Sequence, residues 1–169
     1  MIHIYTGSGK GKTTAATGLA VRAAGSGMRV YFVQFLKNGS SSEIGMMEKI
    51  SINTVYSEKC GKFVSMMSEP EKEEIKALQN DMLKKAIALV EEGFADMLVL
   101  DEFFAAYNSG LIDRKISDVL LKMGGQAEIV LTGRNAPEKY AEAADYLSEI
   151  KAVKHPYEKG ISARKGIEY

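Results

Sequence analysis

The sequence is poor in the residues that cross-link proteins or bind metals. It holds one cysteine, Cys60, and two histidines, His3 and His155. A single cysteine excludes an intrachain disulfide and a metal site of the CxxC type. Two isolated histidines make no metal site, so we interpret both as structural residues.

An excess of positive charge is also missing, because lysine plus arginine equal aspartate plus glutamate at 22 each. Proteins that bind nucleic acids or acidic membranes broadly carry a basic excess, so we expect neither partner. No apolar run approaches membrane-spanning length, and the first residues predict a strand rather than a signal peptide. We therefore expect a cytoplasmic protein.

Strand-like and helix-like segments alternate along the chain. The 169 residues, 46% of them hydrophobic, suffice for one globular domain, which we expect over residues 1–169. Strands are expected over 2–6, 29–36, 50–56, 96–100, 128–132 and 146–153. Helices are expected over 12–24, 68–92 and 113–123, with a short one opened by Asn135-Ala136-Pro137-Glu138. This alternation predicts an α/β fold with a mostly parallel central sheet and helices on both faces.

The segment 2–14 combines a strand, a glycine-rich loop and the start of a helix, in the order that a phosphate-binding loop needs. Glycines let backbone N–H groups wrap a polyphosphate, and the helix adds its positive end. Lys12 is placed to reach the phosphates and Thr13 to ligate Mg²⁺. The predicted nucleotide-binding residues are Gly7, Ser8, Gly9, Lys10, Gly11, Lys12, Thr13 and Thr14.

This loop departs from the strict pattern at one position, where Thr6 replaces a glycine that comes one residue later. Lys10 inside the loop is also unusual. A glycine-rich turn with surface lysines is the alternative interpretation. The strand and helix context favours the phosphate loop and predicts a three-layer P-loop NTPase fold of the RecA-like type.

A second group of candidates follows the predicted strand 97–100. Asp101 and Glu102 emerge where that strand ends, as in a Walker B strand, and can hold Mg²⁺ beside the phosphate loop. The alternative is a solvated acidic turn. Arg134 follows another strand and is either a phosphate or carboxylate ligand or an exposed turn residue. Gln34 and Lys37 carry the same ambiguity.

Several of these segments together resemble the P-loop ATP:corrinoid adenosyltransferases, also called cob(I)alamin or cob(I)yrinic acid a,c-diamide adenosyltransferases. The resemblance rests on segments 5–16, 33–37, 99–102 and 131–134, and on a series of motifs from 144 to 169. Thr6 and Lys10 are normal in that family. The similarity is weak between about 40 and 92.

Three departures from the family pattern concern this weak region and the loop. Ser8 replaces the usual Asn, and the usual Gly-Glu is blurred around 43–45. The family's corrinoid-contacting loop carries a Phe and, two residues on, a Trp. Phe63 matches the Phe, but Ser65 stands at the Trp position and the chain has no Trp. The nucleotide half of the site therefore carries over more fully than the corrinoid half.

The resemblance implies that cobalt(I) of a corrinoid attacks the 5′ carbon of ATP and that triphosphate leaves, in adenosylcobalamin biosynthesis or salvage. It implies catalytic roles for Lys12 and Glu102, and Mg²⁺ held by Thr13, Asp101 and Glu102. Glu102 contacts the ribose in an alternative arrangement. The resemblance further implies nucleotide or corrinoid contacts by Arg134 and Phe63, an electron donor for cobalt and a homodimer.

Two other functions remain open on the sequence. A conventional P-loop kinase or ATPase would need a base or a water-positioning group and would attack phosphorus. A non-catalytic ATP-binding corrinoid carrier or regulator would have kept the loop and lost the chemistry, which the missing Trp leaves open.

Overall fold

The computed structural model describes residues 1–168; Tyr169, which the family resemblance includes, lies outside the described residues. Six strands form one sheet in the order β3-β2-β4-β5-β1-β6, and all of its pairings are parallel. The strands are β1 (Ile2–Thr6), β2 (Val30–Gln34), β3 (Asn53–Val55), β4 (Met97–Asp101), β5 (Glu128–Thr132) and β6 (Tyr146–Glu149).

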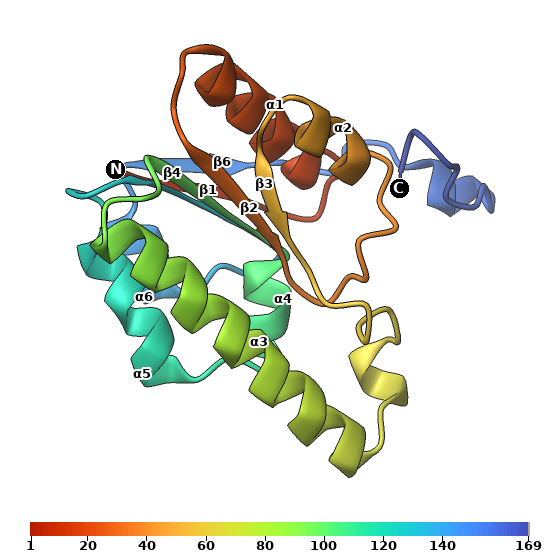
Figure 1. Ribbon diagram of the computed structural model, residues 1–169. Coiled ribbons are helices and arrows are strands. Elements are labelled where there is room, and N and C mark those ends of the chain that lie inside the picture. The colour runs from red at the N-terminus through yellow and green to blue at the C-terminus, as the bar shows by residue number, and fades with distance from the viewer. Residues whose placement is uncertain (169) are drawn as a thin grey trace.

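Helices cover both faces of this sheet, so the predicted three-layer α/β fold is confirmed (Figure 1). The helices are α1 (Lys12–Gly25), α2 (Ile44–Lys49), α3 (Glu69–Glu91), α4 (Phe103–Asn108), α5 (Arg114–Ser117) and α6 (Glu138–Ala143). Short 3-10 helices are η1 (Val64–Met66), η2 (Asp118–Lys122) and η3 (Pro156–Lys159). Helices α1 and α2 lie on one face, and α3 to α6 lie on the other.

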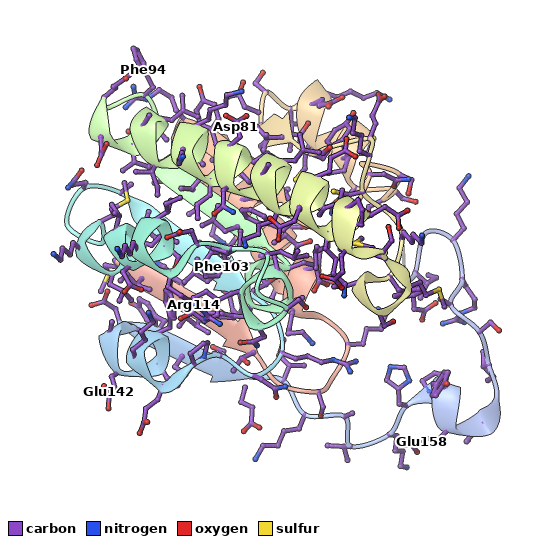
Figure 2. All side chains as sticks on the ribbon, turned by 90° about the horizontal axis from the view of Figure 1, so that it is seen from below. Asp81, Phe94, Phe103, Arg114, Glu142 and Glu158 are labelled. Carbon is purple, nitrogen blue, oxygen red and sulfur yellow. The ribbon has the colours of Figure 1, made fainter. Side chains whose placement is uncertain are left out.

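The two faces are packed by different residue types. On the first face, α1 presents Ala16, Ala20 and Ala23 to the sheet, and these small side chains let the helix approach it closely. On the second face, α3 and an aromatic cluster around Phe103 fill the larger space. Figure 2 shows Phe103 amid the ribbons, whereas Phe94, Glu142 and Glu158 lie at the periphery. Within residues 1–168, no helix has both the length and the apolar character needed to cross a bilayer.

Helix α3 begins where the sequence predicts, at a capping box. The Ser68 N–H donates to Glu71 Oε2 at 2.7 Å, and Pro70 lies in the first turn. These contacts satisfy free N–H groups at the helix start. The helix ends at Glu91, one residue before the predicted end.

Several predicted elements are wrong in detail. Helices α2 and α4 lie in segments where no helix is predicted, and the predicted helix 113–123 divides into α5 and η2. Asn135 is not a helix cap; Pro137 holds that position without a side-chain cap bond. Asn135 instead has a left-handed φ of 54°, a conformation that Asn tolerates better than most residues. Strand β6 ends at Glu149, and β3 spans only Asn53–Val55.

Candidate active site

The loop between β1 and α1 is folded so that the side chain of Lys12, the first residue of α1, contacts the loop backbone. Gly11 is the N-cap residue of α1 with a φ of 118°, a conformation that a side chain would strain. The Lys12 Nζ donates to the carbonyl oxygens of Gly7 at 2.9 Å and Gly9 at 2.8 Å. Burial lowers the pKa of Lys12, and the positive charge of Arg134 lowers it further. The loop thus holds an ammonium group at the N-terminal end of a helix.

A second backbone segment runs directly against this loop. The Gly9 N–H donates to the Ile150 carbonyl at 2.7 Å, and the Ile150 N–H donates to the Thr6 carbonyl at 2.8 Å. A Cβ at Gly7 would lie 2.4 Å from the Ile150 oxygen, and one at Gly9 would lie 2.8 Å from the Lys151 carbonyl carbon. The glycines at these two positions therefore permit close approach of the chain after β6.

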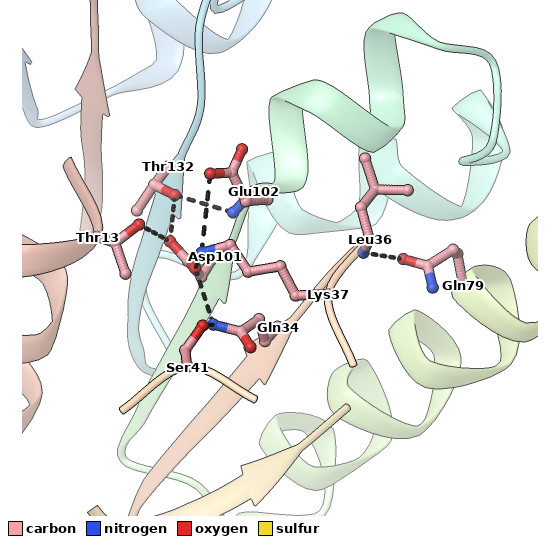
Figure 3. A network of polar contacts seen from close by, with 9 residues as sticks. All are labelled: Thr13, Gln34, Leu36, Lys37, Ser41, Gln79, Asp101, Glu102 and Thr132. Atoms are coloured by element: carbon pink, nitrogen blue, oxygen red, sulfur yellow. Dashed lines mark hydrogen bonds and ion pairs between the residues drawn. The ribbon is translucent and has the colours of Figure 1, made fainter. Parts of the chain in front are cut away.

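A buried carboxylate connects the phosphate loop to the neighbouring strand ends (Figure 3). Asp101 is fully buried at the end of β4. Its Oδ1 accepts from the Thr13 hydroxyl at 2.9 Å and from the Thr132 hydroxyl at 2.8 Å. Its Oδ2 accepts from Lys37 Nζ at 3.0 Å and from Gln34 Nε2 at 3.4 Å. Asp101 therefore brings four chain segments together at one edge of the sheet.

Two residues beside this network have left-handed backbones that only the surrounding contacts stabilise. Glu102 has a φ of 57° and Leu36 a φ of 59°, each a strain on the order of 1 kcal/mol. The Glu102 N–H donates to the Thr132 hydroxyl at 3.0 Å. The Leu36 N–H donates to Oε1 of the buried Gln79 at 3.2 Å (Figure 3). These two left-handed conformations set the direction in which the chain leaves β2 and β4.

Glu102 carries the freer of the two carboxylates. Its nearest cation is Lys37, whose Nζ lies 3.9 Å from Oε1. Burial raises the pKa of Glu102, and the neighbouring Asp101 charge raises it further. Burial works against the charged form of Lys37, but the charges of Asp101 and Glu102 outweigh it and raise the pKa of Lys37.

The oxygen groups at this edge suit a magnesium ion. Among residues 1–168, no three His, Cys, Asp or Glu side chains gather as a metal cluster. Mg²⁺ keeps several waters and needs only one or two carboxylates with phosphate oxygens. Glu102 and the Thr13 hydroxyl fit that requirement, while both oxygens of Asp101 already accept protein donors.

Two cavities meet at the phosphate loop. The smaller, of about 340 Å³, is lined by the loop from Ser8 to Thr14 together with Arg134. The larger, of about 1300 Å³, is lined by Lys37, the serines at 40–42 and Phe63, whose side chain is 76% exposed. Residues lining both include Lys10, Thr13, Thr14 and Glu102. The site residues predicted from the sequence line at least one cavity, with the exceptions of Gly7 and Asp101. These two accept hydrogen bonds from the lining residues Lys12 and Thr13.

The whole sequence is similar to proteins of a known family. A family model described as ATP:corrinoid adenosyltransferase BtuR/CobO/CobP matches residues 1–169. The chain belongs to the ATP:corrinoid adenosyltransferase family. The corrinoid adenosyltransferase of Pseudomonas aeruginosa is 32% identical over 178 residues, covering 100% of this chain and 83% of that protein. Those of Escherichia coli K12 and Salmonella typhimurium are each 31% identical over 172 residues, covering 100% of this chain and 85% of each relative.

The structure also places residues at the site that were not predicted from the sequence. His155, interpreted above as structural, lines the smaller cavity, and Ile167 and Glu168 line both cavities. The segment after β6 has no clear hydrophobic period, so periodicity gave no sign of its position. The family motifs from 144 to 169 were the available signal. The role of Gln79 was not predicted because this residue lies in the predicted helix 68–92, far from any motif.

Replacing Gly9 with alanine tests whether the approach of segment 150–151 matters. The added Cβ would meet backbone atoms of Lys151, which have little room to move. We expect a loss of about 1–3 kcal/mol in the free energy of unfolding and weaker binding of inorganic triphosphate. Urea unfolding and calorimetric titration measure the two effects. Gly25→Ala is the matched control, because a Cβ there meets nothing within 4 Å; equal stability of the two variants would contradict the argument.

Replacing Glu102 with glutamine tests the raised pKa of that carboxyl. The pKa of Glu102 in the folded protein lies above the ordinary 4.5. The native state therefore loses stability as the pH rises from 4.5 through that folded-state pKa. Glu102→Gln should therefore gain free energy of unfolding relative to the unmodified protein as the pH rises above 4.5, while adenosyl transfer falls at least about tenfold. Urea unfolding at several pH values gives the first result. Glu142→Gln, an exposed change on α6, is the control, and its free energy of unfolding should differ from that of the unmodified protein by the same amount at every pH. A difference that is equally constant for Glu102→Gln would refute the linkage.

Proposed function

We propose that the protein transfers the 5′-deoxyadenosyl group of ATP to the cobalt(I) of a corrinoid, with cob(I)alamin as its substrate. The supporting observation is that the cavity lined by the phosphate loop adjoins a larger one and that Glu102 lines both. The larger volume of about 1300 Å³ exceeds the roughly 300–1000 Å³ of ordinary small-molecule sites. It therefore has room for a substrate larger than a nucleotide.

In the proposed reaction the cobalt(I) electron pair attacks C5′ of ATP. A cobalt–carbon bond forms, the C5′–O bond breaks, and that electron pair stays on the departing triphosphate, so that cobalt is formally oxidised to cobalt(III). The protein's task is to stabilise charge on the leaving group. Lys12 and the backbone N–H groups of the loop other than that of Gly9, which donates to Ile150, supply this stabilisation. Arg134 adds a third source of positive charge. No protein nucleophile is required.

Mg²⁺ would be held by Thr13 and Glu102, with Asp101 hydrogen-bonded to Thr13 behind them. Bound there, the ion would neutralise part of the triphosphate charge. Asp101 acts by accepting the Thr13 hydroxyl hydrogen and thereby orienting the threonine oxygen. In this arrangement Asp101 does not contact the ion directly, in contrast to the prediction from the sequence. The reason is that Oδ2 of Asp101 already accepts hydrogen bonds from Lys37 and Gln34.

Phe63 is the proposed corrinoid contact on the wall of the larger cavity. Its exposed ring stands beside Ser65 in η1, where relatives have a Trp by the family resemblance. A serine there offers much less apolar surface to a corrin ring. We further propose that residues 1–169 act as one domain in the cytoplasm, as a homodimer, with a separate electron donor for cobalt.

A turnover assay tests the function directly. Purified protein, MgATP and chemically reduced cobalamin or cobinamide are combined, and loss of the cobalt(I) absorption band is followed. Light-sensitive adenosylated product with stoichiometric triphosphate is the expected result. Release of ADP would indicate a kinase or ATPase instead. Binding of both ligands without product would indicate a corrinoid carrier or regulator.

A further inference from the structure

The C-terminal tail, residues 150–168, is fixed to the phosphate loop by its own backbone. Besides the bond from Gly9 to Ile150, the Ala152 N–H donates to the Ser8 hydroxyl at 3.4 Å. The tail thus leaves β6 along the rim of the loop, although most of its later residues are exposed. Its first residues are fixed relative to the loop backbone.

Further along the tail, His155 reaches the lining of the smaller cavity, which Lys12 and Arg134 also line. The Tyr157 N–H donates to His155 Nδ1 at 3.2 Å. A ring nitrogen that accepts a hydrogen bond carries no proton, so the neutral ring bears its proton on Nε2. The local turn therefore selects the tautomer in which His155 can donate to an anion.

The end of the described chain returns to the same place. Ile167 and Glu168 line both cavities. Arg164 donates three hydrogen bonds to Glu168: its backbone N–H to Oε2 at 2.8 Å, Nε to Oε2 at 3.3 Å and Nη2 to Oε1 at 3.1 Å. Arg164 lowers the pKa of Glu168, and Lys10 of the phosphate loop contributes to the same shift. The tail is therefore hydrogen-bonded to the loop at its start, and its end lines the same cavities, with His155 between them.

We propose that the C-terminal tail completes the polyphosphate site and that His155 is a binding residue that donates a hydrogen bond from Nε2 to a phosphate oxygen. The proposal rests on the proposed function only in taking that anion to be the triphosphate of ATP. A residue that holds the leaving group contributes more as negative charge accumulates on it. The tail motifs that carry the family resemblance thereby receive a chemical role.

Two substitutions of His155 separate phosphate binding from local structure. His155→Ala removes both nitrogens. In His155→Asn, the shorter side chain can still accept the Tyr157 N–H in a turn of the Asx type but lacks the reach of Nε2. Glu158→Gln, at an exposed tail position that lines neither cavity (Figure 2), is the matched control. Binding of inorganic triphosphate with Mg²⁺ is measured by isothermal titration calorimetry, without corrinoid.

We expect both His155 variants to bind triphosphate about tenfold more weakly, with the control unchanged. Wild-type affinity in His155→Asn would show that only the turn matters and would overturn the proposal. A protein that adenosylates corrinoid but binds triphosphate equally well with and without His155 would overturn the proposal and leave the function intact. Triphosphate binding that depends on His155 without corrinoid turnover would support the proposal and refute the function.

Discussion

Lys12→Ala is expected to lower kcat/KM for ATP by about 10- to 150-fold. The substitution removes a charged donor worth about 1.5–3 kcal/mol. It also frees the carbonyl oxygens of Gly7 and Gly9, which Lys12 Nζ contacts at 2.9 and 2.8 Å. The loop then loses the charge of Lys12 and two hydrogen bonds that help to set its shape. Adenosyl transfer at varied ATP concentration measures the effect.

The matched control for this experiment is Lys85→Ala. Lys85 lies exposed on α3, where it pairs with Asp81 one turn earlier, so its loss should leave kcat/KM within twofold. An unchanged kcat/KM in Lys12→Ala would remove the phosphate loop from the mechanism. A rise in KM for ATP with constant kcat would instead show that Lys12 binds substrate and transition state equally.

Asp101→Ala should cost about 3 kcal/mol in the free energy of unfolding and reduce kcat by about 100-fold or more. The change leaves the Lys37 ammonium without its closest partner and removes the acceptor of the Thr13 and Thr132 hydroxyls. Unpartnered buried groups lose hydration without compensation. Urea unfolding and the turnover assay, each with and without Mg²⁺, measure the two losses.

Asp101→Asn and Asp81→Ala make this experiment specific. Asparagine keeps the shape and one oxygen, but its amide N–H₂ must face either two hydroxyls or Lys37, so we expect an intermediate loss of stability. Asp81 is exposed on α3, and its removal should be within about 0.5 kcal/mol of neutral. If Asp101→Ala were as stable as Asp81→Ala, the network would not support the site.

The sequence predicts the parts of the fold that follow strong local rules. Strands 2–6 and 128–132 and the start of α3 at Ser68 agree with the structure because alternation of elements, buried apolar runs and a capping box each have a short-range signal. The glycine-rich loop likewise lies between β1 and α1, and the Asp101-Glu102 pair lies where β4 ends, as the sequence predicts. Their chemical roles stay predictions.

The rest depends on tertiary contacts that no local pattern contains. Helix α4 begins at Phe103 only because Glu102 takes a left-handed backbone held by the Thr132 hydroxyl, 30 residues away. The site position of His155 depends on the docking of Ile150 against Gly9. The contact of Lys37 with Asp101 likewise joins residues separated by 64 positions.

The pairing of β1 has a consequence for the order in which the protein folds during synthesis. Ile2 pairs with Ile129 of β5, and Thr6 pairs with Glu149 of β6. At about 5–20 residues per second, the first strand leaves the ribosome on the order of 10 seconds before its neighbours exist. Strands β2 and β4 and helix α3, all within residues 30–101, can assemble during that interval. The phosphate loop is thus translated first but acquires its shape last.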